Sequence, residues 1–203
     1  MTYAELIAAI AAWAEDDSAE LSTEIPQIVE NAERIIFVDL PNLPAFRTTA
    51  TGSLVQGTST VAKTSGTRVT RAFYIVVSSN RIYLERRLDS YLDAYWPNPA
   101  TEGQPKFFCE DDETNYRLAP TPDSAYAYGA YFTRLPTGLT VSNANTEVGD
   151  NYEDMLLKAC MWETCKFLQF WEAALFWKEE YITEAAKIDP EIKKMYQNEA
   201  GVR

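Results

Sequence analysis

Four adjacent acids form the one group of side chains in this sequence whose types and spacing could bind a metal ion: Glu110, Asp111, Asp112 and Glu113. Hard cations such as Mg²⁺ and Ca²⁺ need clustered oxygen ligands, and a metal-dependent enzyme could be built on such a turn. Adjacent acids at a hairpin tip more often point into water. The run is therefore either a solvated turn or an ion site, and Asp16 and Asp17 pose the same choice.

Histidine is absent from all 203 residues. Its absence removes the commonest general base, the commonest metal ligand and every Ser-His or Cys-His nucleophile arrangement. The sequence also lacks a GxGxxG run, a Walker phosphate loop and a CxxC pair. We therefore predict that the protein is not an enzyme, that it has no catalytic, metal-binding or cofactor-binding residues, and that it needs no cofactor.

The three cysteines, Cys109, Cys160 and Cys165, are an odd number without the spacing of a disulfide framework. We expect no structural disulfide, and a reducing compartment fits. Cys160 and Cys165 are five positions apart on an expected helix, which separates them by about 140° and prevents a shared ligand. We interpret them as small core residues.

Basic side chains gather in one stretch of 25 positions in which only Glu85 opposes them: Lys63, Arg68, Arg71, Arg81, Arg86 and Arg87. Such a patch binds either nucleic acid or protein. The acidity of the rest of the chain favours protein, and the arginines are therefore candidate subunit-interface residues. Their counter-charges could be residues 110–113 or 15–24 of an adjacent copy, as in a head-to-tail ring.

The formal charge is −12, and it belongs to the two ends of the chain. Residues 1–40 carry nine acidic side chains and one basic, residues 41–149 carry ten of each, and residues 150–203 carry eleven acidic and seven basic. A protein this acidic should not wrap nucleic acid, because phosphate neutralisation needs clustered Lys and Arg. An acidic wall along which DNA slides remains open.

The N-terminal part predicts two helices. Thr2 and Glu5 have the spacing of a capping box, and apolar residues then recur at helical intervals over residues 3–15. Ser22 or Thr23 can cap a second helix with Pro26 in its first turn, and Pro41 and Pro44 end it.

The central part predicts a small antiparallel β region with one embedded helix. The hydroxyl-rich residues 48–70 suggest a flexible hairpin or a disordered linker, and residues 117–136, with a proline turn followed by alternating aromatics, predict a hairpin arm. The other expected elements are strands over residues 72–77, 106–109 and 115–118, and a helix over residues 82–95.

The C-terminal part predicts one long helix over residues 152–187 that is rich in aromatic side chains. Its charged residues occupy an arc of roughly 140°, so the remaining apolar arc is wider than one neighbouring helix can cover. The helix must be buried against several elements or against other subunits, which makes Trp171 and Trp177 candidate interface residues.

A short final helix is expected over residues 191–199, with Asp189 and Pro190 at its start. It offers little apolar surface for its own folding, so we interpret it as a segment that docks on a partner. Its candidate docking residues are Ile192, Lys193, Lys194, Met195, Tyr196 and Arg203.

We predict an α+β fold: a helical body from the N- and C-terminal helices, holding a central antiparallel β region with an embedded helix. The chain is read as a single domain over residues 1–203, with a helix pair (1–40), a β-rich insertion (41–149) and the aromatic and final helices (150–203). No apolar run approaches the roughly 20 residues of a membrane span, and the first residues lack the cationic start of a secretory signal. We expect no membrane contact and no export.

Three parts of the sequence together resemble the adaptor (connector) proteins at the head-to-tail junction of tailed bacteriophages. The first is the opening helix pair, with residues 3–7, Trp13, Asp16, Asp17, 25–29 and 32–35; the second is residues 117–136; the third is the aromatic helix after Tyr152. Residues 48–70 and the extra C-terminal helix depart from the family pattern, which leaves the partner contacts open.

The resemblance implies a structural virion protein, made in the host cytoplasm, that forms a ring, commonly of twelve copies. The ring would sit beneath the portal protein, hold the tail or nozzle protein on its far side, and let DNA pass through without sequence-specific binding. The final helix would then dock on the portal. A phage neck or tail-completion protein is the alternative within the virion, and a metal-dependent enzyme using residues 110–113 is the alternative from another class.

Overall fold

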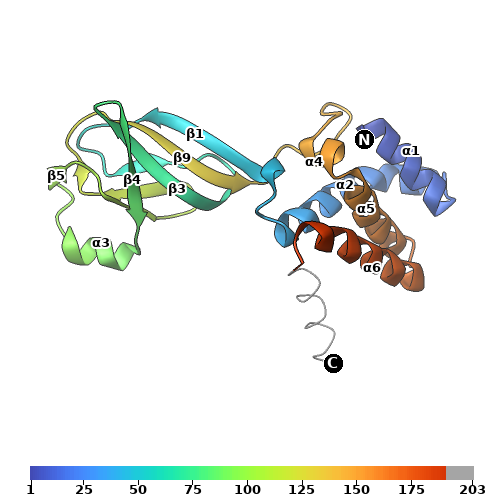
Figure 1. Ribbon diagram of the computed structural model, residues 1–203. Coiled ribbons are helices and arrows are strands. Elements are labelled where there is room, and N and C mark those ends of the chain that lie inside the picture. Colours follow the sequence, from blue (N-terminus) through green and yellow to red (C-terminus); the bar gives the residue numbers. More distant parts are fainter. Residues whose placement is uncertain (191–203) are drawn as a thin grey trace, which may run out of the picture. The chain divides into compact units, whose positions relative to one another are not determined.

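The computed structural model describes residues 1–190 and contains two compact units, each with its own core (Figure 1). The helical unit comprises Met1–Phe46 and the residues from Leu135 onward, and the β unit comprises Arg47–Arg134. The predicted α+β class is confirmed, with helices from both ends of the chain and strands between them. The predicted final helix lies outside the described residues.

The first helix, α1 (Tyr3–Ala14), begins with the predicted capping box. The Thr2 hydroxyl accepts a hydrogen bond from the Glu5 amide, and the Glu5 carboxylate accepts one from the Thr2 amide at 2.7 Å. These two bonds satisfy amides that the first turn leaves without helical partners. The apolar spacing places Leu6 and Ile10 in the core, and Glu15 ends the helix in the left-handed region.

The second helix, α2 (Ala19–Asp39), starts earlier than predicted. Ser18, rather than Ser22 or Thr23, is its N-cap and accepts from the Leu21 amide at 3.2 Å. Pro26 therefore lies inside the helix instead of in its first turn. The helix still ends before Pro41, as expected, because the residue that precedes a proline disfavours helical backbone.

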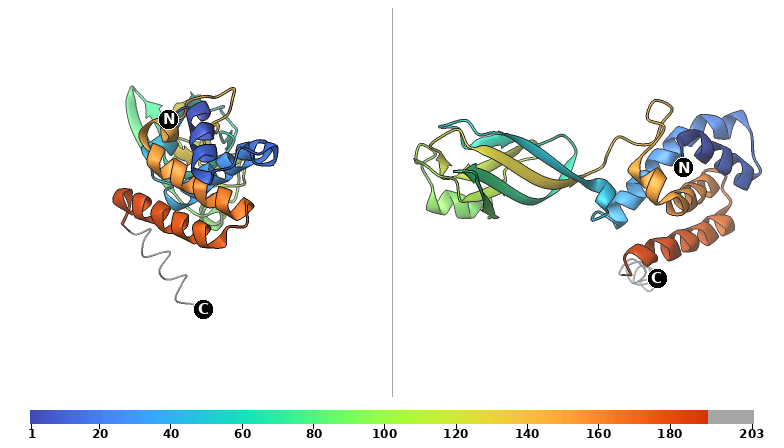
Figure 2. Two further views of the ribbon diagram at one scale, coloured as in Figure 1. Left: turned by 90° about the vertical axis from the view of Figure 1, so that its right-hand side faces the viewer. Right: turned by 45° about the horizontal axis from the view of Figure 1, so that its top comes forward.

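The predicted long C-terminal helix is wrong: the chain forms α5 (Glu153–Phe167) and α6 (Trp171–Ile188), and a turn at residues 168–170 separates them. Gln169 takes a left-handed conformation there, with φ 60°. Figure 2 shows α6 returning along α5. Lys158 on α5 reaches Glu184 on α6 at 3.0 Å. Because of the reversal, the apolar residues of this segment do not share one continuous helix face.

The core of the helical unit lies among α1, α2 and α5, with Tyr181 and Ala185 of α6 added. Tyr181 is fully buried, and its hydroxyl donates to the Asp39 carboxylate at 2.8 Å. The smaller elements of the unit are the 3₁₀ turn η1 (Pro44–Phe46) and the helix α4 (Glu147–Asn151). No helix in the described part of the chain is long and apolar enough to cross a membrane.

The β unit contains a seven-stranded sheet in the order β1-β9-β3-β4-β6-β7-β2, a two-stranded sheet of β5 and β8, and one helix. Neighbouring strands of the large sheet are antiparallel except for the parallel pair of β4 and β6, and β5 and β8 are also parallel. The elements are β1 (Arg47–Ser53), β2 (Thr60–Ala62), β3 (Thr67–Val77), β4 (Asn80–Arg86), α3 (Asp89–Tyr95), β5 (Glu102–Gly103), β6 (Phe107–Glu110), β7 (Asn115–Ala119), β8 (Thr121–Pro122) and β9 (Ala127–Arg134).

Both predicted hairpins in this region are wrong, although their strands exist. Residues 48–70 are neither a linker nor a hairpin, because β1 pairs with β9 and β2 pairs with β7. Residues 117–136 do not form an arm, since β9 pairs with β1 and β3 while β7 pairs with β6 and β2. A period of two identifies a strand but does not name its partner.

The predicted helix over residues 82–95 is strand β4 in its first part and α3 only from Asp89. Ser78 and Ser79 have φ 48° and 68°, which is the backbone of a two-residue hairpin turn between β3 and β4. The turn places Ile82 opposite Ile75 and Leu84 opposite Phe73. The helical spacing in this segment was thus coincidental.

Candidate interaction surfaces

The acidic turn at residues 110–113 is held by hydrogen bonds between Asp112 and the two residues that follow the turn. The Asp112 carboxylate accepts from the Thr114 amide at 2.6 Å and from the Asn115 amide at 2.7 Å. Hydrogen bonds from the Asn115 and Thr114 side chains and amides hold the pKa of Asp112 far below its usual range. These bonds favour the charged form, so Asp112 stays ionised and its oxygens order the turn.

Glu110, at the end of β6, faces basic side chains instead of its acidic neighbours. Its carboxylate lies 3.2 Å from the Arg86 guanidinium and 3.9 Å from the Lys63 ammonium. The Lys63 ammonium also donates to the Asp112 carbonyl. Within residues 1–190, no three Asp, Glu or Cys side chains are grouped as metal ligands.

All three cysteines are buried and free. Burial, with a smaller contribution from the Glu33 charge, raises the pKa of the Cys160 thiol, so this thiol stays protonated. A protonated, buried thiol is neither a nucleophile nor a metal ligand. The cysteines therefore fill space in the core.

The candidate interface arginines are divided among different environments. Arg86 pairs with Glu110 as described, and Arg87 pairs with Glu85 at 2.6 Å and lies over the Tyr91 ring at 5.0 Å. Arg68, Arg71 and Arg81 lie elsewhere on β3 and β4 and are exposed. Their closeness in sequence therefore does not make one continuous patch.

Arg81 belongs to a surface that we call the Arg–Tyr face, formed by Arg71, Tyr74, Arg81, Tyr83 and Tyr131 on the sheet. Its guanidinium lies over the Tyr74 ring at 4.8 Å and donates to the Tyr131 hydroxyl at 3.1 Å. The Tyr131 and Tyr74 phenols raise the pKa of Arg81, which therefore stays charged. The face includes a hollow of about 560 Å³ that Arg71, Tyr83 and Tyr131 help to line.

Sequence reasoning missed the tyrosines of this face. Strand register brings them together: Tyr74 lies opposite Tyr83 across β3 and β4, and Tyr131 lies opposite Ala72 across β9 and β3. Gly129, opposite Tyr74, leaves room for that ring, because a Cβ there would collide with it. The period-two alternation of the three strands is visible in the sequence. The strand order is also needed to show that the three tyrosines lie on one face of the sheet.

Exposed apolar side chains cover the turn between α5 and α6 and the start of α6, and we call them the aromatic ridge: Phe167, Phe170, Trp171, Leu175 and Phe176. Trp171 is 63% exposed and Leu175 is 64% exposed. Trp177, the other candidate tryptophan, is half-buried and packs against Trp13 with ring centroids 5.2 Å apart. Large exposed aromatics in such number are typical of surfaces that bind other proteins.

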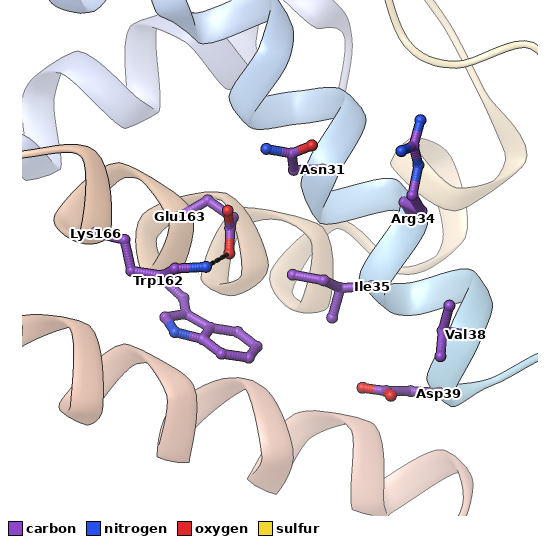
Figure 3. A pocket seen from close by; sticks show the side chains of 8 residues that line it. All are labelled: Asn31, Arg34, Ile35, Val38, Asp39, Trp162, Glu163 and Lys166. Atoms are coloured by element: carbon purple, nitrogen blue, oxygen red, sulfur yellow. Dashed lines mark hydrogen bonds and ion pairs between the residues drawn. The ribbon is translucent and has the colours of Figure 1, made fainter.

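A groove in the helical unit lies between α2 and the C-terminal part of α5 (Figure 3). Its volume is about 420 Å³, Ile35, Val38 and Trp162 supply apolar walls, and Asn31 and Arg34 lie at its edge. Lys166 donates to the Glu163 carboxylate at 2.6 Å. The groove therefore combines an apolar surface with one ion pair.

One buried carboxylate has a clear structural role. Glu33 on α2 accepts the Leu139 amide hydrogen with its two carboxylate oxygens, each 3.1 Å from the nitrogen. Burial raises the pKa of Glu33, which the bond from Leu139 only partly offsets. Glu33 therefore anchors the loop that leads from the last strand to α4.

These features define an α+β protein with two exposed candidate binding surfaces. The aromatic ridge lies on the helical unit, and the Arg–Tyr face lies on the β unit. The model of the SU10 adaptor protein family matches residues 1–202. The chain therefore belongs to this family of phage head-to-tail adaptors. It is a structural protein of the virion, and the family implies interaction with portal and tail components. No curated protein matches the chain.

Proposed function

We propose that the protein forms a ring between the portal and the tail and that DNA passes through this ring. The observation that carries the proposal is the match to an adaptor family over nearly the whole chain. The family resemblance gives twelve copies as the expected number. The net charge of −12 suits a channel through which DNA moves without binding.

The aromatic ridge is the proposed contact through which copies assemble or dock. Trp171 exposes most of its side chain in the single chain, and burying an aromatic of this size in an interface is a common source of binding energy. Trp177 would act indirectly, because it packs on Trp13 and against Phe176, the last residue of the ridge.

Two further contacts complete the proposal. The arginines Arg68, Arg86 and Arg87 would add polar contacts between subunits, and residues 191–203 would dock on the portal. The docking residues lie outside the described part of the chain, so sequence alone supports this second contact. A tail or nozzle protein would bind on the opposite side of the ring.

The experiment is co-sedimentation of the full-length protein with its portal. Wild-type protein should sediment with the portal in a multiple-copy complex, and Trp171→Ala should do so about tenfold more weakly. Leu88→Ala is the matched control, because Leu88 is also exposed but lies in the β unit. Wild-type protein that never sediments with the portal would refute the proposed function.

A further inference from the structure

The Arg–Tyr face holds two arginines that pair with no carboxylate of residues 1–190. Four other basic residues of the β unit each pair with an acid: Lys63, Arg86, Arg87 and Arg117. Among the described residues, by contrast, no carboxylate lies within ion-pair distance of Arg71 or Arg81. The β unit thus pairs many of its charges internally and leaves these two available on one exposed sheet face.

The geometry of Arg81 prepares it for a ligand. Stacking on Tyr74 and the bond to Tyr131 hold the guanidinium in place, so little side-chain freedom remains to be lost on binding. A guanidinium has five N–H donors, and the bond to Tyr131 uses one of them. Tyr83, which is 57% exposed, adds an aromatic surface with a hydroxyl beside it. Fixed arginine and tyrosine side chains are frequent anchors of protein interfaces.

A complementary surface lies at the corner between α1 and α2, which we call the acidic corner: Asp16, Asp17 and Glu20. Asp16 accepts from the Ser18 amide at 2.8 Å, a bond that shapes the corner. In the described part of the chain none of the three acids pairs with a Lys or Arg. Arg34, the one basic residue among the first 40, pairs with Glu30 at 2.6 Å.

We propose that the Arg–Tyr face of one copy binds the acidic corner of a second copy. Residues 1–190 present two different surfaces of opposite charge whose charged groups have no ion-pair partner within that part of the chain, and a head-to-tail interface joins two such different patches. Nucleic acid is the weaker candidate, because the remaining charge of the chain would repel phosphates. This inference rests on the proposed ring and names one of its contacts.

The test compares single charge reversals in the full-length protein assembling on its portal. Arg81→Glu and Asp17→Lys should each weaken assembly about tenfold, the effect expected for one close interface charge pair. Lys106→Glu is the matched control, since Lys106 is exposed on the same unit and has no ion pair among the described residues. It should assemble like the wild type. Unchanged melting temperatures would show that the variants fold.

The double variant Arg81→Glu with Asp17→Lys restores opposite charges at every interface of a ring and should recover most of the lost assembly. Equal assembly of Arg81→Glu, Lys106→Glu and wild type would overturn this interface and leave the proposed function standing. A double variant no better than Arg81→Glu alone would overturn it as well. A wild-type protein that does not assemble on the portal would refute the proposed function and this contact together.

Discussion

The two units of this protein use their side chains differently. The helical unit buries a large core yet exposes aromatic residues at the turn between α5 and α6, and Trp171 is its most evident case. The β unit buries aromatics such as Phe73 and Tyr116 in the core of its sheet and pairs many of its charges, with the Arg–Tyr face as the exception. The difference suggests apolar contacts for the first unit and polar contacts for the second.

The largest expected effect is the loss of stability when a core residue of the β unit is truncated. Phe73 is fully buried and packs against Phe108, Tyr116 and Tyr128. Phe73→Ala should lower the free energy of unfolding by about 3–5 kcal/mol, because it removes a large side chain and leaves a cavity. Urea denaturation measures this change. A loss below about 1 kcal/mol would mean that the sheet core is not packed as described.

The next effect concerns the anchor of the loop in the helical unit. Glu33→Ala leaves the buried Leu139 amide without its acceptor and should cost about 1–3 kcal/mol. Glu33→Gln keeps one acceptor oxygen and should cost less. Thermal unfolding of both variants at one pH provides the comparison, and equal losses would show that the hydrogen bond is unimportant.

The pH dependence of the same site has a definite sign. Burial raises the pKa of Glu33 above 4.5, so the folded protein holds this proton to a higher pH than the unfolded chain does. The contribution of Glu33 to stability is therefore full below pH 4.5 and declines as the pH rises through the raised pKa. Glu33→Gln should remove this decline from a series of melting curves, and an unchanged series would contradict the assignment.

A smaller effect on stability distinguishes the two candidate tryptophans of the helical unit, one half-buried and the other exposed. Trp177→Ala should cost about 1–3 kcal/mol, because Trp177 is half-buried against Trp13. Trp171→Ala should change stability by less than about 0.5 kcal/mol, because this side chain is largely exposed. Melting curves of the isolated protein test both. A large loss for Trp171→Ala would place it in a core and remove the case for the ridge.

The smallest effect is expected from metal removal. Asp112 bonds within its own turn and Glu110 pairs with Arg86, so EDTA should leave the melting temperature unchanged. A fall in melting temperature that Ca²⁺ or Mg²⁺ restores would revive the ion site at residues 110–113.

Local signals in the sequence predicted the elements better than their partners. The Thr2–Glu5 capping box and the strands on either side of the acidic turn are confirmed, because caps and turns depend on neighbouring residues. The break at Gln169 has no glycine or proline to mark it, so the helical period appeared continuous. The pairing of β1 with β9 joins residues far apart in sequence, and no local pattern encodes it.

The candidate surfaces were predicted in part by residue type. The width of the apolar arc predicts Trp171 as an interface residue, and its side chain is exposed. Closeness in sequence predicts one basic patch, but Arg86 and Arg81 have different partners because alternate residues of a strand point to opposite faces. Tyr74 and Tyr131 could not be added to that patch before the strand order was known.

Imaging the wild-type protein bound to its purified portal tests the central claim most directly. The proposed function predicts a ring of copies that shares the portal's axis and leaves an open channel for DNA. Inspection of the contacts between neighbouring copies in that ring would also locate Trp171 and Arg81. Portals that carry no such ring, or single copies bound off the axis, would contradict the account.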